Sequence, residues 1–182
     1  MLEREKSIGL VIDVQGRLAR ITHESEAIIG SITRLIRGLK VLEVPIVLTE
    51  QYPEGLGATV PEISGLLGTY LEDNMFVKQT FSCCGEDGFV DHIKQLDRRQ
   101  VIVGGIEAHV CVYQTVCDLL DKDFDVTVVA DCVSSRSEAD RTIALERMRD
   151  EGAKLSSVEM VLFELQREAS GPRFKELLHI VK

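Results

Sequence analysis

The sequence has no excess of positive charge, because 21 lysines and arginines are outnumbered by 30 aspartates and glutamates, for a formal net charge of −9. No basic stripe is available to neutralise phosphates, so we expect no binding to nucleic acid. Long apolar runs are also missing. None approaches the roughly 18 residues that a membrane helix needs, and residues 1–6 contain no apolar signal core. These absences predict a soluble cytoplasmic protein that is neither exported nor inserted into a membrane.

The sequence also lacks the cysteine pattern of a disulfide-stabilised scaffold. Its five cysteines are an odd number without a regular spacing, which favours free thiols in a reducing compartment. Cys83 and Cys84 are adjacent, whereas metal ligands from one turn usually have two to four residues between them. We therefore expect neither a disulfide framework nor a metal site from these cysteines.

Internal repeats and low-complexity segments are absent as well. The chain has 182 residues, 45% of them hydrophobic, so it can bury one sizeable core, and residues 1–182 are interpreted as a single domain. Short apolar runs typical of buried strands alternate with segments of helical periodicity. The expected strands are residues 7–13, 45–49, 74–78, 101–104, 125–131 and 153–155, and the expected helices are residues 28–39, 89–96, a segment beginning near 109, 137–148, 156–165 and 172–182.

Local signals refine this pattern in two places. Residues 51–67 are rich in proline and glycine and are interpreted as a long irregular loop, either a pocket wall or a surface insertion. Ser137 with Asp140, and Ser156 with Glu159, have the spacing of capping boxes that begin helices.

The alternation of strands and helices predicts an α/β fold. We expect a three-layer α/β/α arrangement around a six-stranded, mostly parallel, doubly wound sheet of order 3-2-1-4-5-6. In such a sheet, ligands bind beyond the carboxyl ends of the strands, where the strand order reverses. Asp13 ends the first strand, Lys78 ends the third, and Cys111 lies just beyond the fourth. We expect these three side chains to meet at one edge of the sheet.

Together the three residue types suit acyl transfer through a thioester. A helix start and a neighbouring ammonium group both favour a thiolate, so we expect the pKa of Cys111 to lie below that of an ordinary thiol. A carboxylate such as Asp13 can take the proton, and backbone N–H groups in the turn can hold an oxyanion. Taken singly, however, each of the three is more often structural, as a cap, a solvated charge or a buried filler.

Three segments resemble the signature motifs of the isochorismatase-like cysteine hydrolase superfamily. They are VIDVQ at residues 11–15, FVK at residues 76–78 and GGIEAHVCV at residues 104–112. The resemblance runs from about residue 7 to residue 165, in the order found in the family. TEQYP at residues 49–53 and ADCVSSR at residues 130–136 are most similar to its isochorismatase domain-containing branch.

This resemblance implies a role for each residue of the motifs. Cys111 is the nucleophile, Asp13 the general base and Lys78 the support of the thiolate. A cis peptide bond between Ile106 and Glu107 is also implied, which would aim the N–H groups of Glu107 and Cys111 at an oxyanion. Members that retain the cysteine hydrolyse small amides, whereas members that lack it cleave the vinyl ether of isochorismate. The presence of Cys111 therefore favours C–N bond hydrolysis.

The chain departs from the family's nicotinamidases in one respect. Those members carry an aspartate and two histidines as metal ligands in the loop after the second strand. Here residues 51–67 contain no histidine, so we expect no metal and no cofactor, and nicotinamidase activity is not favoured.

Several further residues are assigned to the wall of the substrate pocket. His109 lies two positions before Cys111, and helix neighbours at that spacing point away from each other, so no Cys–His dyad is expected. The pocket-wall residues are Gln15, Arg17, Gln51, Tyr52, Phe81 and His109.

These observations predict a metal-independent cysteine hydrolase that acts on a small-molecule amide or a related C–N substrate. The alternative is a domain of the same fold without turnover, which binds partners or senses oxidants through the Cys111 thiol. Vinyl-ether hydrolysis is a less favoured third possibility. The resemblance also implies a homo-oligomer, a dimer or larger.

Overall fold

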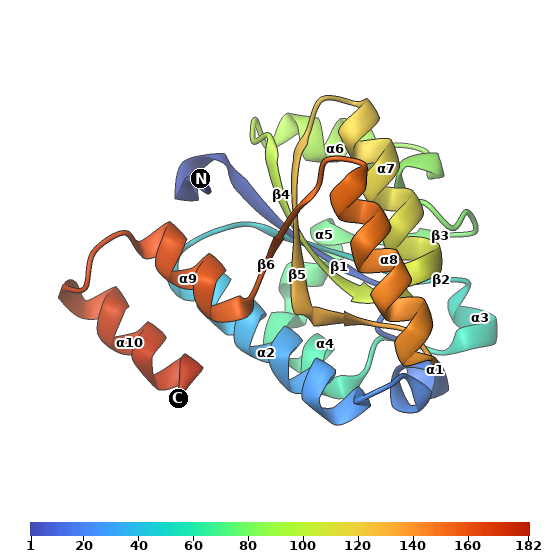
Figure 1. Ribbon diagram of the computed structural model, residues 1–182, viewed down its shortest axis with the longest axis horizontal. Coiled ribbons are helices and arrows are strands. Elements are labelled where there is room, and N and C mark those ends of the chain that lie inside the picture. The colour runs from blue at the N-terminus through green and yellow to red at the C-terminus, as the bar shows by residue number, and fades with distance from the viewer.

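One six-stranded sheet forms the centre of the molecule. The computed structural model describes all of residues 1–182. Each pair of neighbouring strands is parallel, and the strand order is β3-β2-β1-β4-β5-β6 (Figure 1). The predicted α/β class and strand order are confirmed, and the sheet is entirely parallel rather than mostly so. The strands are β1 (Ser7–Ile12), β2 (Ile46–Gln51), β3 (Met75–Lys78), β4 (Gln100–Ile106), β5 (Asp125–Ser134) and β6 (Lys154–Ser156).

Helices fill the connections between the strands. None of them combines the length and the apolarity needed to cross a membrane. Three short 3-10 turns are η1 (Arg4–Lys6), η2 (Gly68–Tyr70) and η3 (Cys83–Gly85), and η4 (Ala108–Val112) is a turn of π-helix. The α-helices are α1 (Gly16–Ile21), α2 (Ser25–Val41), α3 (Pro53–Leu56), α4 (Pro61–Leu67), α5 (Leu71–Asn74), α6 (Phe89–Gln95), α7 (Tyr113–Asp121), α8 (Glu138–Asp150), α9 (Val158–Gln166) and α10 (Gly171–Val181).

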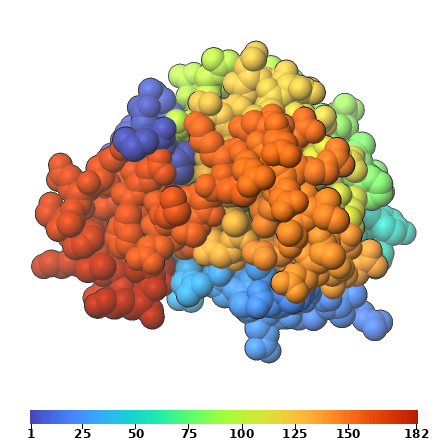
Figure 2. Space-filling view, viewed as in Figure 1, coloured from blue at the N-terminus to red at the C-terminus, as the bar shows by residue number.

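Two hydrophobic cores pack against the two faces of the sheet. Helices α2, α4, α9 and α10 cover one face, and α6, α7 and α8 cover the other (Figure 1). Figure 2 shows that α8 and the C-terminal helices α9 and α10 form much of the molecular surface on the viewer's side. Every residue of β1, β2 and β4 is buried. This double coverage explains why these strands have continuous apolar runs instead of an alternating pattern.

Residues 51–67 differ from the predicted irregular loop. They contain two short helices, α3 and α4, separated by a brief connection. Both helices begin at a proline, Pro53 and Pro61. Proline is well suited to the first helical position because its fixed φ matches the helix and its missing N–H would have no partner there. The two prolines that favoured an irregular loop are therefore the first residues of helices.

One of the two predicted N-cap serines is correct and the other is displaced by one residue. The Ser137 side chain accepts a hydrogen bond from the backbone N–H of Asp140 at the start of α8. The second cap is Ser157, which accepts from the N–H of Met160, rather than Ser156. Ser156 is the last residue of β6, so the helix begins one residue later than the spacing suggested.

Strands β4 and β5 extend further than predicted, toward the carboxyl edge of the sheet. Their pairing shifts register between Val103 and Gly105, which is the mark of a β-bulge. Gly105 has a φ of +137°, and a Cβ atom added there would lie 2.2 Å from the carbonyl oxygen of Ile12. Only glycine therefore allows β4 to approach β1 this closely, immediately before Asp13.

This close approach predicts the effect of adding one methyl group. Gly105→Ala should lower the free energy of unfolding by at least about 2 kcal/mol, because the new Cβ meets backbone atoms and the φ is unfavourable for alanine. Gly65→Ala is the matched control: its Cβ would meet nothing within 4 Å in α4, so the change should stabilise by roughly 0.5–1 kcal/mol. Urea unfolding of both variants checks this, and equal stabilities would contradict it.

Candidate active site

The carboxyl edge of the sheet brings Asp13, Lys78 and Cys111 into one cluster. Asp13 directly follows β1, Lys78 is the last residue of β3, and Cys111 lies in η4, beyond β4. The charges of Asp13 and Lys78 both act on the Cys111 thiol. We refer to these residues as the three-residue cluster.

Lys78 and Asp13 form a buried ion pair. The distance between Lys78 Nζ and Asp13 Oδ2 is 2.7 Å, and the side chains are 0% and 3% exposed, respectively. Because β2 lies between β3 and β1, the lysine side chain spans the width of one strand to reach the carboxylate. A charge pair this far from water is retained only where further hydrogen bonds support both partners.

Such hydrogen bonds surround the ammonium group of Lys78. Besides Asp13, its Nζ donates to Gln51 Oε1 at 2.7 Å, to the Phe81 carbonyl at 2.9 Å and to the Thr80 carbonyl at 3.2 Å. An ammonium group has three N–H donors, so these four acceptors use its donating capacity completely. Lys78 therefore acts on the site through its charge and through Asp13.

The Asp13 carboxylate has a donor on each oxygen. Its Oδ2 accepts from Lys78, and its Oδ1 accepts from the Thr49 hydroxyl at 2.7 Å. The backbone N–H of Asp13 also donates to the Thr49 carbonyl, at 3.1 Å. The residue has a φ of +52°, in the left-handed region that non-glycine residues seldom adopt. Asp13 is thus fixed in both its main chain and its side chain.

Gln51 joins the ion pair to the thiol. Its Oε1 accepts from Lys78 and lies 4.0 Å from Cys111 Sγ, and its Nε2 donates to the Gln79 carbonyl. Gln15 is fully buried and holds the Gln51 main chain: its Oε1 accepts from the Gln51 N–H at 2.7 Å, and its Nε2 donates to the Gln51 and Gly57 carbonyls. Of these two predicted wall residues, Gln51 contacts the cluster, whereas Gln15 supports the backbone behind it.

Cys111 is less acidic than predicted. The residue is only 8% exposed, and the pKa of its thiol is raised to about 12, first by burial and second by the negative charge of Asp13. Lys78 lowers the pKa, but less than the other two effects raise it. The expectation of a lowered pKa was therefore wrong, because loss of hydration outweighs the favourable ammonium neighbour.

The turn before the cysteine has the predicted backbone geometry. The peptide bond between Ile106 and Glu107 is cis. The Glu107 N–H donates to no backbone or side-chain acceptor in the fold, and its carboxylate accepts from the Nε of Arg136 at 2.9 Å. The turn is thus tied to the segment between β5 and α8, while the N–H of Glu107, four residues before Cys111, has no acceptor.

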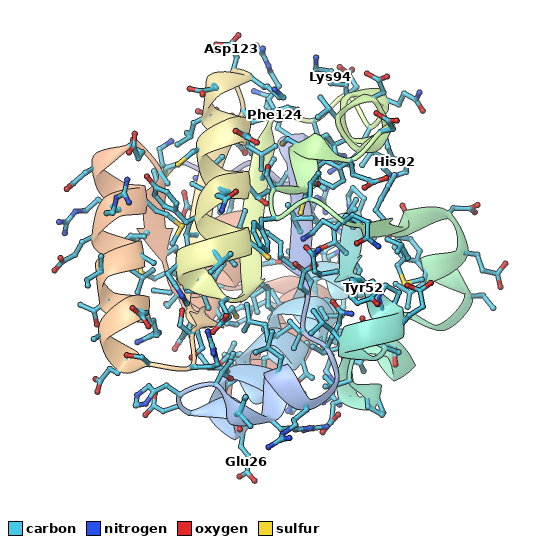
Figure 3. All side chains as sticks on the ribbon, turned by 90° about the vertical axis from the view of Figure 1, so that its right-hand side faces the viewer. Glu26, Tyr52, His92, Lys94, Asp123 and Phe124 are labelled. Atoms are coloured by element: carbon cyan, nitrogen blue, oxygen red, sulfur yellow. The ribbon has the colours of Figure 1, made fainter.

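The remaining predicted wall residues have different environments. Arg17, Tyr52 and Phe81 are exposed, and Figure 3 shows Tyr52 beside helix α3. The Tyr52 N–H donates to the Lys78 carbonyl, and the Phe81 carbonyl accepts from Lys78, so both aromatic residues adjoin the cluster. His109 is half-buried, with its Nδ1 2.9 Å from Ser135 Oγ.

Three residues next to the cluster were not predicted. They are Thr49, Thr115 and Cys83. The Thr115 hydroxyl donates to the Cys111 carbonyl at 2.7 Å, and the Cys83 N–H donates to Thr115 Oγ1 at 3.0 Å. The position of Thr49 near the end of a buried strand was a usable signal, because a hydroxyl there needs a partner. Thr115 and Cys83 gave no signal, since they lie 32 residues apart in sequence.

No set of three or more His, Cys, Asp or Glu side chains is grouped closely enough to hold a metal ion. The buried polar side chains at the cluster instead form hydrogen bonds with one another. All five cysteines are free thiols.

Comparison with known proteins gives consistent matches along most of the chain. The model of the family described as the isochorismatase domain matches residues 7–160. Isochorismatase domain-containing protein 2 of Xenopus laevis is 37% identical over 182 residues, covering 99% of this chain and 85% of that relative. The secreted isochorismatase effector Isc1 of Phytophthora sojae is 40% identical over 179 residues, covering 97% of this chain and 84% of the relative.

Solved structures match the same fold. The structure described as MAR1 ribonuclease from Caenorhabditis elegans has a TM-score of 0.92 and 38% sequence identity, covering 99% of this chain and 91% of that one. The YcaC gene product of Escherichia coli, described as an octameric hydrolase of unknown specificity, has a TM-score of 0.90 and 24% identity, covering 98% of this chain and 88% of that one.

The buried ion pair predicts a large loss of stability on removal of one partner. Lys78→Met should lower the free energy of unfolding by about 3–5 kcal/mol, because the Asp13 carboxylate loses its counter-charge. Adding Asp13→Asn to that variant should recover part of the loss. Arg20→Met breaks a half-exposed pair with Glu62 and should change stability little. Urea unfolding measures the stability of all these variants. An unchanged free energy of unfolding in Lys78→Met would contradict a buried ion pair between Lys78 and Asp13.

The raised pKa of Cys111 predicts its response to alkaline pH. A group whose pKa is about 12 is protonated at neutral pH, so alkylation of Cys111 by iodoacetamide should keep accelerating above pH 9. A simple thiol such as glutathione should instead level off. Asp13→Asn removes a negative charge and should shift this rise to lower pH. Peptide mass spectrometry gives the rates, and a plateau near pH 8.5 in the wild type would contradict the prediction.

Proposed function

The chain belongs to the isochorismatase family, and on this premise we propose that it is a hydrolase of a small amide or a related C–N substrate. The reaction proceeds through a thioester on Cys111, with Asp13 as the general base and Lys78 as the positive charge that supports the thiolate. The observation that carries the proposal is the buried Lys78–Asp13 pair beside a thiol. Buried charges that perturb the pKa of a nucleophile are typical of active sites.

In the first half of the reaction, the Cys111 thiol transfers its proton to Asp13. The sulfur electron pair forms a bond to the substrate carbonyl carbon while the carbonyl electron pair moves onto oxygen. The N–H of Glu107, which has no acceptor in the fold, and that of Cys111 hold this oxyanion. When the carbonyl re-forms, the C–N bond breaks and the leaving nitrogen takes the proton from Asp13.

In the second half, water replaces the amine. Asp13, again ionised, accepts a proton from the water as its oxygen attacks the thioester carbonyl. The C–S bond breaks, the acid leaves, and the sulfur of Cys111 recovers the proton from Asp13. The net reaction is amide plus water to acid plus amine. A thiol that is protonated at rest fits this scheme, because the base removes its proton only as the new bond forms.

The raised pKa also bears on the alternative of a redox-sensing domain. Cysteines that sense oxidants have a low pKa and are accessible to solvent. Cys111 has the opposite properties, since its pKa is raised to about 12 and it is 8% exposed. These properties favour turnover over sensing. Vinyl-ether hydrolysis is a weaker candidate, because a cysteine at this position suits attack on a carbonyl.

The wider setting of the chain is a further part of the proposal. We propose a small-molecule substrate, a cytoplasmic location that suits five free thiols, and a homo-oligomer of two or more copies. One relative is described as a ribonuclease, but a net charge of −9 gives this chain little means to bind RNA, so RNA cleavage is not proposed.

A panel of small amides tests the proposal. At least one amide should release ammonia or amine, and the intact protein should gain the mass of the acyl group at Cys111 after rapid quenching. Cys111→Ser should abolish release, because a serine hydroxyl at this position is a far weaker nucleophile. Coupled ammonia detection and intact-protein mass spectrometry provide the two readouts.

Cys117→Ser is the matched control, because Cys117 is a half-buried thiol in α7 and has no contact with the cluster. It should retain full activity. Turnover that survives Cys111→Ser would rule out the mechanism. A panel without turnover, combined with ready formation of sulfenic acid on Cys111 in hydrogen peroxide, would favour the redox alternative instead.

A further inference from the structure

Thr49 is a buried polar residue that contacts the cluster and has no part in the mechanism above. It lies in β2, is 0% exposed, and pairs in register with Ile12, the residue before Asp13. It makes two hydrogen bonds to one residue: its carbonyl accepts the Asp13 N–H, and its hydroxyl donates to Asp13 Oδ1 at 2.7 Å. The strand pairing accounts for the backbone bond. It does not account for a hydroxyl at this position.

We propose that Thr49 is a positioning residue, whose hydroxyl keeps the Asp13 carboxylate ionised and oriented to receive the Cys111 proton. Lys78 donates to Oδ2 only, so Thr49 is the donor that fixes the other oxygen. With both oxygens held, the carboxylate plane cannot rotate, and each oxygen retains a second lone pair for the incoming proton.

The direction of the Thr49 hydrogen bond is set by its other neighbour. A hydroxyl has one proton to give, and the Cys83 thiol lies 3.8 Å from Thr49 Oγ1 as a donor. Burial raises the pKa of Cys83 to about 11, which keeps that thiol protonated. The Thr49 proton is therefore available to Asp13, in a chain that runs from Cys83 through Thr49 to the carboxylate.

The groups around Asp13 show what loss of the hydroxyl would do. The titratable groups that face the carboxylate are the Lys78 ammonium from β3, the Cys83 thiol from η3 and the Cys111 thiol from η4; the Gln51 side chain from β2 is neutral. Without the hydroxyl, Oδ1 loses its donor on a residue that is only 2% exposed. A lost bond to the charged form favours the protonated acid, so Asp13 would stop acting as a base at a higher pH.

Alkylation of Cys111 by iodoacetamide tests this without any substrate. The sulfur forms a bond to the reagent's methylene carbon, iodide leaves, and the thiol proton passes to Asp13. Because a protonated carboxylic acid cannot accept this proton, the rate falls toward acidic pH, which gives an acid limb. Thr49→Val should move this limb to higher pH by about one unit, a roughly tenfold slower reaction on the limb.

Two control variants distinguish the effect of losing the hydroxyl from the effect of changed packing. Thr49→Ser keeps the hydroxyl and should retain the wild-type limb. Thr127→Val makes the same change at a buried threonine of β5, whose side chain has no contact with the cluster, and should also leave the limb in place. If Thr49→Val does not fold, Thr49→Ala is the second variant without a hydroxyl. A wild-type limb in the hydroxyl-free variant, or an equal shift in Thr49→Ser, would overturn the proposal.

This inference rests on the proposed role of Asp13 as the base, and Asp13→Asn distinguishes the two. That variant should lose the acid limb altogether. If it keeps the limb, the base role itself fails. If it loses the limb while the hydroxyl-free Thr49 variant keeps a wild-type limb, only the assignment of Thr49 fails. The amide panel is a separate measurement and decides neither outcome.

Discussion

The Lys78–Asp13 ion pair requires that several chain segments meet at one point. The ammonium group needs acceptors from the end of β1, the end of β2 and the carbonyls that follow β3, and it finds them in Asp13, Gln51, Thr80 and Phe81. Moving two charges out of water costs several kcal/mol for each ion, so each missing hydrogen bond would count heavily. The segments around the thiol are arranged to meet this requirement, and Gln15 behind Gln51 is part of the same arrangement.

The same exclusion of water determines the state of the nucleophile. In the low-dielectric environment, the attraction between Lys78 and Asp13 is strong, whereas a lone thiolate is disfavoured. The cluster therefore holds its negative charge on the carboxylate and its proton on the sulfur. A nucleophile in this state is activated by transfer of its proton to a neighbour, and the distances within the cluster matter more than the acidity of the free thiol.

Much of this arrangement could be predicted from the sequence, for identifiable reasons. Continuous apolar runs showed which strands are buried on both faces, and alternation with helices then restricted the strand order. Asp13 and Lys78 could be found because each ends a short apolar run, although the run before Lys78 belongs to a partly exposed strand. The pKa of Cys111 could not, since it depends on how much water the fold excludes. Thr115 and Cys83 were not predicted for a similar reason. Their contact joins segments that are distant in the sequence, and the local sequence pattern does not indicate such contacts. Residues 51–67 were misread because proline marks helix starts as well as loops.

Strand β3 carries Lys78 and is also an edge strand of only four residues. Met75 and Val77 are exposed, and the strand pairs with β2 alone. Edge segments with few buried contacts open locally at a lower free energy than the core. Brief separation of β3 would carry Lys78 away from Asp13 while β1, β4 and both hydrophobic cores stay folded. The fraction of molecules with an assembled site would then depend on the local stability of β3 as well as on the global stability.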